Sequence, residues 1–206
     1  MFTPAYAHRA ARRYRRNGLD RRAQQMVDFL TGCGIDGASV LEIGGGVGEL
    51  HLELLRRGAA HATNLELSSA YEQDAAELLA ETGLAARVDR RLVDIAVDPA
   101  AVEPADVVVL DRVVCCYPDH ARLLAVAADH AKRLLAFSYP RDSMLVKAVL
   151  ATQNTVLALA GRSFRVFAHP PRAMLATLAD HGHNVTFTHR GPVWQAVGTQ
   201  RKSAGT

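Results

Sequence analysis

Glycines and acids alternate in one stretch of the chain, and this combination suits a nucleotide-like ligand. Glu42 stands near the end of a short apolar run, and Gly44, Gly46 and Gly48 follow at every second position. Without a Cβ atom, these glycines let the backbone turn sharply and let a ligand lie directly on the main chain. The residues after them have a helical pattern, and the N-terminal end of a helix attracts negative charge. We therefore expect a strand, a tight turn and a helix that together hold a cofactor.

The spacing of the glycines separates two classes of cofactor. Dinucleotide-binding turns have the pattern G-x-G-x-x-G, in which the third glycine allows the helix to pack closely beside a pyrophosphate. Counted from Gly44 and Gly46, that third glycine would stand at position 49, which is Glu49, and an anion there would repel a pyrophosphate. The pattern Glu42-x-Gly44-x-Gly46-x-Gly48 instead resembles the first motif of class I S-adenosylmethionine-dependent methyltransferases.

A second acid follows at the distance that such a cofactor site needs. Residues 61–66 form a strand-like run that ends in Glu66, 22 positions beyond Gly44. At the end of the second parallel strand, a carboxylate faces the ribose of a bound nucleoside, and its oxygens accept hydrogen bonds from the hydroxyls. Glu66, with Leu67 beside it, is therefore a candidate cofactor contact. The alternative is an incidental surface acid.

A third acid lies in the next strand-like run, residues 91–95. Class I methyltransferases place a residue beside the adenine amine at this point. The resemblance therefore implies that Asp94 accepts a hydrogen bond from that amine and that Ile95 lies next to the cofactor. The alternative for Asp94 is a loop acid or a helix cap.

The most strand-like run in the chain, residues 105–110, leads into a further motif. Its nearly continuous Val and Leu residues predict a central parallel strand that is buried on both faces. The segment after it begins with Asp111-Arg112 and ends with Cys116-Tyr117-Pro118, and it resembles the fourth motif of the same superfamily. More narrowly, it is similar to small-molecule O-methyltransferases of the magnesium-protoporphyrin methyltransferase type. Those enzymes have a histidine in place of Cys116, so this chain departs from them at the position of the general base.

Three residues are candidates for catalysis. A disulfide between the adjacent Cys115 and Cys116 would be strained, and no histidine or cysteine stands at a zinc-like spacing from them. Cys116 is therefore either a small pocket-lining residue or a catalytic thiol. His169, in a segment that resembles the one after the fifth strand of these enzymes, is either a substrate contact or a structural histidine before two prolines. Tyr14 belongs to the arginine-rich residues 1–22, which form a solvated surface helix, a lid over the site, or a contact for nucleic acid or an acidic surface.

These motifs belong to an α/β fold, a Rossmann-like doubly wound sheet of seven strands, mostly parallel with a C-terminal antiparallel hairpin. Residues 1–34 are expected to form a helical lid, in which Asp20 caps the second helix. Residues 140–171 exceed what such a sheet needs, and they predict a substrate-side insertion. Its helix over 143–160 is interrupted by polar residues and too short to span a membrane, so we expect it to cap the pocket, buried on most sides, or to form a dimer contact.

Length and composition indicate one soluble globular domain over residues 1–206, which the resemblance implies is a methyltransferase domain. The chain is 49% hydrophobic and 22% charged, with a net charge of +3 that does not by itself imply a nucleic-acid partner. Its three cysteines form neither a disulfide framework nor a metal-ligand spacing, and its first residues have no signal-peptide pattern. We expect a cytoplasmic monomer or homodimer without a metal.

The resemblance implies methyl transfer from S-adenosylmethionine, with S-adenosylhomocysteine as the product. The protein aligns a nucleophile with the sulfonium methyl, and it needs a general base only when that nucleophile is a neutral hydroxyl or amine. A carboxylate or an acidic phenol needs none, which favours transfer to oxygen in a small molecule. RNA or protein acceptors, and a cofactor-binding protein without catalysis, are the alternatives. A negative lining, from Glu42, Glu66, Asp94 and Asp111, suits a cationic sulfonium.

Overall fold

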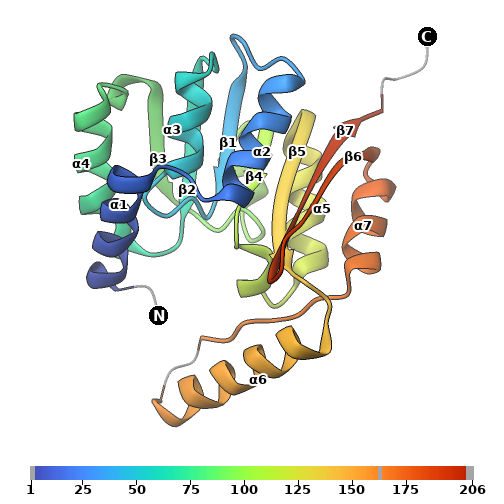
Figure 1. Cartoon of the computed structure of the whole chain (residues 1–206). Helices are drawn as coiled ribbons and strands as arrows, with labels where there is room; N and C mark the ends of the chain where they lie inside the picture. Colours follow the sequence, from blue (N-terminus) through green and yellow to red (C-terminus); the bar gives the residue numbers. More distant parts are fainter. Residues whose placement is uncertain (1–2, 162–163, 203–206) are drawn as a thin grey trace.

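Seven strands form one sheet in the computed structural model, which describes residues 3–161 and 164–202 (Figure 1). The strand order is β3-β2-β1-β4-β5-β7-β6, and β7 alone runs in the direction opposite to the other six described strands. The predicted Rossmann-like sheet with its antiparallel C-terminal hairpin is confirmed. The strands are β1 (Ser39–Ile43), β2 (His61–Glu66), β3 (Val88–Leu92), β4 (Ala105–Leu110), β5 (Ala131–Pro140), β6 (His183–Arg190) and β7 (Trp194–Arg201).

Helices cover both faces of the sheet (Figure 1). Asp20 begins the second of them, as predicted, by accepting a hydrogen bond from the Ala23 N–H at 2.9 Å. The α-helices are α1 (Pro4–Asn17), α2 (Arg21–Gly32), α3 (Glu49–Arg56), α4 (Glu72–Thr82), α5 (His120–His130), α6 (Met144–Leu159) and α7 (Pro171–Asp180). Single 3-10 turns, η1 (Ser69–Tyr71), η2 (Ala85–Arg87), η3 (Pro99–Ala101) and η4 (Val114–Cys116), lie in the connections.

The central strand β4 is buried on both faces, as its sequence predicts. Its side chains alternate between two cores because successive residues of a strand point to opposite faces. Val107 and Val109 pack with α2 and α3, whereas Val108 and Leu110 pack with α5 and α7. The carboxyl ends of β1, β2 and β4 therefore meet along one edge, where polar side chains can gather.

The third strand begins and ends earlier than its sequence pattern predicts. β3 pairs with β2 from Ala62↔Val88 to Glu66↔Leu92. The two strands thus end together, and Asp94 lies in the turn beyond them instead of within a strand over 91–95. The prediction was wrong because β3 is an edge strand, which accommodates polar residues and so has no clear apolar run.

The helix of residues 140–171 is exposed, and the expectation that it is buried on most sides is wrong. Within α6, Val146 alone is fully buried, whereas its outward apolar side chains lie in solvent. Figure 1 shows the reason, because α6 extends away from the layers around the sheet after the chain leaves β5. It contacts the rest of the protein along one face only.

Candidate active site

The glycine turn between β1 and α3 has a backbone that only glycine fits easily. Gly44 and Gly46 have φ angles of +66° and +56°, in the left-handed region that other residues rarely adopt. A Cβ atom at Gly44 would lie 2.5 Å from Val113 Cγ2, and one at Gly45 would lie 1.9 Å from Asn64 Nδ2. The turn therefore packs closely against Val113 and Asn64, and a ligand bound beside it would contact backbone atoms directly.

Glu66 holds this turn in place with its carboxylate. Its Oε2 atom accepts a hydrogen bond from the Gly46 N–H at 2.9 Å, and its Oε1 atom accepts from the N–H groups of Leu67 and Ser68 at 2.7 and 3.0 Å. A carboxylate offers about four lone-pair positions. One position, on Oε2, thus stays open toward the cavity that Glu66 lines.

Glu42 lies beneath the same turn and is 2% exposed. Its Oε2 atom accepts from His51 Nδ1 at 2.6 Å and from the His51 backbone N–H at 3.2 Å, which fastens the first turn of α3 to β1. The imidazole in turn lies under Gly48, where a Cβ atom would stand 2.3 Å from its Cε1 atom. Glu42, which is predicted to contact the cofactor, lines the described part of the cavity. Gly48 is not among the described lining residues; it precedes the first turn of α3, with a φ of +95°.

Asp94 lines the cavity from the turn after β3. It accepts hydrogen bonds from the Tyr117 hydroxyl at 3.1 Å and from the Ala96 N–H at 3.0 Å. Leu67 is 62% exposed and Ile95 is buried, and both line the cavity together with Asp94. A polar acceptor between two apolar side chains suits a flat base with an exocyclic amine.

A hydrogen-bond network joins the ends of β4 and β5. The Ser138 hydroxyl donates to Asp111 Oδ1 at 2.6 Å, and the Ser138 Oγ atom accepts from the Arg112 N–H at 2.9 Å. Asp111 also accepts from Arg22 Nη2, in α2, at 2.8 Å. Ser138 thus fixes both residues that follow β4.

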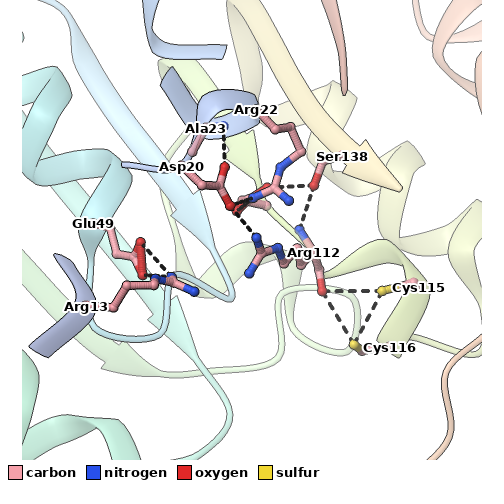
Figure 2. Close-up of polar contacts among 10 residues, drawn as sticks. Arg13, Asp20, Arg22, Ala23, Glu49, Arg112, Cys115, Cys116 and Ser138 are labelled. Atoms are coloured by element: carbon pink, nitrogen blue, oxygen red, sulfur yellow. Dashed lines mark hydrogen bonds and ion pairs between the residues drawn. The ribbon is translucent and has the colours of Figure 1, made fainter. Parts of the chain in front are cut away.

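Two arginines meet an acid beside this network (Figure 2), and both also lie near an aromatic ring. Arg22 and Arg112 both donate to Asp20, and their guanidinium carbons lie 5.5 and 5.6 Å from the centre of the Trp194 ring. Burial raises the pKa of Asp20, but the Ala23 N–H and the charges of Arg22 and Arg112 outweigh it, so that this pKa is lowered overall. With Asp111, the cluster contains two positive and two negative side chains.

These groups line one cavity of about 700 Å³, a volume typical of small-molecule sites. Its floor is the glycine turn with the ends of β1, β2 and β4. α1 contributes Tyr6, Ala10 and Arg13, and Arg13 is held by Glu49 at 2.7 Å (Figure 2). The residues 140–171 contribute Leu150, Gln153, Phe164 and Val166.

Cys115 and Cys116 both line the cavity, and their Sγ atoms lie 3.6 Å apart. Each thiol also lies near the Arg112 carbonyl oxygen, at 3.5 and 3.4 Å (Figure 2). The hydrogen bond from Cys115 lowers the pKa of Cys116, although burial and the Glu66 charge act against it. The same hydrogen bond, together with burial, raises the pKa of Cys115. Cys116 is therefore the thiol of the pair that ionises first.

The structure places Tyr14 outside the described lining of the cavity. Its hydroxyl donates to Glu53 Oε1 at 2.7 Å, and its ring packs among α1, α3 and α4. Burial and the bond to Glu53 raise the pKa of this hydroxyl above its usual range. Tyr6 lies in the cavity instead, because eight residues of helix end about 80° past a whole number of turns. Tyr14 thus anchors α1 to α3, away from the described lining of the cavity.

His169 also lies outside the described lining. Its Nε2 atom donates to the Tyr117 carbonyl at 3.0 Å, and its ring stacks on that of His120 with centroids 4.1 Å apart. Burial, and then the charge of His120, lower its pKa. The residue fastens the segment after α6 to the segment after η4, which is the structural alternative for this histidine.

Sequence patterns do not identify three residues of the site: Arg22, Ser138 and Trp194. Ser138 does carry a signal, because it is a polar residue at the carboxyl end of an apolar strand beside β4. Arg22 and Trp194 carry none. They reach the cavity only because β7 pairs with β5 and α2 packs against both strands.

Solved structures with the same fold include methyltransferases. Magnesium protoporphyrin IX methyltransferase from Synechocystis PCC 6803, with bound SAH, is 20% identical over 87% of this chain and 83% of that chain, with a TM-score of 0.68. An O-methyltransferase family protein from Burkholderia thailandensis is 20% identical over 90% of this chain and 57% of that chain, with a TM-score of 0.70. An O-methyltransferase family 2 protein from Planctomyces limnophilus, in a complex with apigenin, is 18% identical over 95% and 62% of the two chains, with a TM-score of 0.70.

Sequence comparison adds the family. No curated protein matches the chain by sequence. The profile of a family described as a methyltransferase domain matches residues 6–186. These residues include the glycine turn, both cysteines and the four charged residues of the cluster, whereas Trp194 lies beyond them. The chain therefore belongs to this methyltransferase domain family.

Proposed function

We propose that the chain transfers a methyl group from S-adenosylmethionine to an oxygen atom of a small-molecule acceptor, either a carboxylate or an acidic phenol. One observation carries the proposal: a single cavity extends from the glycine turn to residues of the insertion, and its described lining includes no histidine or lysine. These are common general bases for a neutral hydroxyl or amine. An oxygen that is already anionic near neutral pH needs no such base.

The nucleoside end of the cofactor fits two places in the cavity. The open position on Glu66 Oε2 suits one ribose hydroxyl, and Asp94 suits the adenine amine between Leu67 and Ile95. The glycine turn supplies the close backbone that a nucleoside needs. Support also comes from the Synechocystis enzyme of the same fold, which was crystallised with SAM and with SAH.

The amino-acid end of the cofactor carries one ammonium and one carboxylate. The two acids and two arginines of the cluster, Asp20, Arg22, Asp111 and Arg112, complement such a pair of charges. When bound, the cofactor supplies a methyl group on a sulfonium, which is already a good leaving group. The chain then has to align the acceptor oxygen and exclude water, and such alignment contributes roughly 7–11 kcal/mol to lowering a barrier.

The acceptor end of the cavity favours a molecule with an apolar body. Leu150, Phe164, Val166 and Trp194 line it, with Gln153 as a polar contact. Cys116 also lines the cavity, and the Cys115 hydrogen bond lowers its pKa, so it is the candidate residue for taking a proton from the fraction of a phenol that is still neutral; the anionic fraction needs no base. A carboxylate acceptor would leave this thiol without a chemical role.

The arginines of α1 support a small acceptor over RNA. Arg13 pairs with Glu49 at 2.7 Å, and Arg15 pairs with Glu81 at 2.8 Å. Two of the five arginines of α1 are thus paired with acids of the chain, which reduces the positive charge that this helix offers to phosphates. Binding to RNA would lose affinity steeply with salt, which gives the alternative its own test.

Calorimetric titration with S-adenosylmethionine and S-adenosylhomocysteine tests the cofactor. We expect saturable binding with a dissociation constant in the micromolar range, about −8 kcal/mol, and a loss of at least tenfold in Glu66→Ala. Glu103→Ala removes an exposed acid outside the cavity and is the matched control. Binding that is absent in the unaltered chain would refute the proposal.

Transfer of an isotope-labelled methyl group to a panel of aromatic carboxylates and phenols tests the acceptor. A methyl ester releases methanol in mild alkali and a methyl ether does not, so the two products are separated by one treatment. Cofactor binding without transfer to any acceptor, including RNA and protein, would instead support a protein that binds the cofactor without catalysis.

A further inference from the structure

Helix α6 presents an apolar face that no part of the described chain covers. Met144 and Leu159, at its two ends, are 83% and 85% exposed, and Leu145, Val149 and Val156 between them are also exposed. Its inner face is attached to the protein: Val146 is buried, and Asn154 exchanges two hydrogen bonds with the Val166 backbone, at 2.8 and 2.9 Å. The apolar side chains therefore lie on the side of the helix that faces away from the body.

The polar residues on this outer face are already satisfied. Thr152 and Thr155 donate their hydroxyls to the carbonyls of Ala148 and Ala151, each at 3.0 Å. A threonine bonded in this way has no donor left for water and presents its methyl group. The outer face can therefore enter an apolar medium without leaving a hydroxyl proton unpaired, and this is what an interfacial helix requires.

Between Asp142 and Asp180, the charged residues of the sequence are all basic. The 37 residues between Asp142 and Asp180 contain no Asp or Glu, and they contain the basic residues Lys147, Arg162, Arg165 and Arg172. Lys147 pairs with Asp142 at 2.6 Å, whereas Arg172 is exposed at the start of α7. An apolar helix within a segment of positive charge is complementary to an anionic apolar surface.

We propose that α6 docks on a membrane that contains anionic lipids, with its outer face at the boundary between headgroups and acyl chains. In the part of the chain that the structure describes, no helix has the length and apolar character needed to cross a membrane. α6 therefore lies on the surface. A second copy of the chain fits this face less well, because each copy would bring an equally basic segment to the contact. Leu150 and Gln153, on the inner side of the same helix, line the cavity, so docking brings the cavity close to the lipid.

Co-sedimentation of the full chain with lipid vesicles tests this proposal. We expect binding to vesicles of phosphatidylcholine mixed with phosphatidylglycerol, weaker binding to phosphatidylcholine alone, and release by high salt. Val156→Glu places a charge in the middle of the outer face and should lower the partition coefficient about tenfold or more. Val97→Glu makes the same change at an exposed valine in the segment between β3 and β4 and is the matched control. Circular dichroism and thermal melts confirm that both variants fold.

Three results would overturn the proposal. The first is an unaltered chain that stays in solution with anionic vesicles. The second is an equal loss of binding in Val97→Glu and Val156→Glu. The third comes from sedimentation velocity: a dimer that Val156→Glu converts to a monomer, with no vesicle binding in either form, would assign the face to a second copy. Since vesicle binding needs neither cofactor nor acceptor, its failure is separate from any failure of the proposed chemistry.

Discussion

Glu66 Oε2 accepts a hydrogen bond from the Gly46 N–H at 2.9 Å, so the acid at the end of β2 fixes the turn at the end of β1. The same carboxylate also faces the cavity. One side chain thus has two roles, an internal one that shapes the glycine turn and an external one toward a ligand. The two roles can be separated by substitution, because the internal role needs only acceptors.

Glu66→Gln and Glu66→Ala should differ in stability more than in cofactor binding. The alanine leaves the N–H groups of Gly46, Leu67 and Ser68 without their partner, and an unsatisfied donor costs about 1–3 kcal/mol. The glutamine keeps one carbonyl acceptor and should retain more of the free energy of unfolding. Both lose a carboxylate for ribose. Urea denaturation and calorimetry on the two variants measure the two effects, and equal losses of stability would contradict the anchoring role.

Gly45→Ala should destabilise the protein by about 1–3 kcal/mol, the usual cost of overpacking a tight site. Its Cβ atom would lie 1.9 Å from Asn64 Nδ2 and 2.7 Å from the Glu42 carboxyl carbon, both of which are buried. Gly32→Ala is the matched control, because it lies at the end of α2 with nothing within 4 Å of an added Cβ atom and no positive φ. We expect the control to be neutral or to gain up to about 1 kcal/mol in urea denaturation. A silent Gly45→Ala would mean that Asn64 can move aside.

Sequence patterns could predict the sheet and the cofactor side of the site because both depend on local signals. The glycines at 44 and 46, the acid at 66 and the apolar run before Asp111 each mark the carboxyl end of a strand. Parallel strands bring those ends to one edge whatever the rest of the chain does. The position of the site therefore follows from strand order alone.

The remaining residues of the site depend on how elements rotate and pack, which periodicity does not specify. The stripe of Tyr6, Ala10 and Tyr14 is correct as a helix pattern, yet the helix turns Tyr14 toward Glu53 and leaves Tyr6 in the cavity. For α6, apolar composition predicts burial, although an apolar face can equally stay exposed, as it does here. Trp194 comes from β7, and no local pattern connects it to Arg22.

Cys116 should react with iodoacetamide before Cys115, because their hydrogen bond lowers the pKa of Cys116 and raises that of Cys115. Tandem mass spectrometry can locate the label between the adjacent residues. In Cys115→Ala the donor is gone, so the pKa of Cys116 should rise and its labelling near pH 7 should slow about several-fold. S-adenosylhomocysteine should protect Cys116, which lines the cavity. Preferential labelling of Cys115 would show that the hydrogen bond runs in the other direction.

His169 should make stability fall on mild acidification. Its pKa is lowered in the folded protein by burial and by the charge of His120, whereas in the unfolded chain it is about 6.5. Stability is therefore complete above that value, and it is lost as the pH falls through the lower pKa of the folded state, because the unfolded chain takes up the proton first. His183, buried against Ala128, has a lowered pKa of the same origin and acts in the same window.

His169→Gln removes the His169 share of this dependence. At pH 7.5 the variant should be less stable than the unaltered chain by about 1 kcal/mol, since it loses the hydrogen bond to the Tyr117 carbonyl. At pH 5.5 that gap should narrow, because the unfolded form of the unaltered chain then gains a proton on His169 that the folded form resists. The glutamine variant has no titrating group at this position, so its stability does not change for this reason. Urea denaturation at the two pH values measures the gap, with His61→Gln, at an exposed position of β2, as the control. A gap that widens at pH 5.5 would mean that the folded state favours the charged imidazole, and then His169 would be a candidate proton donor or acceptor after all.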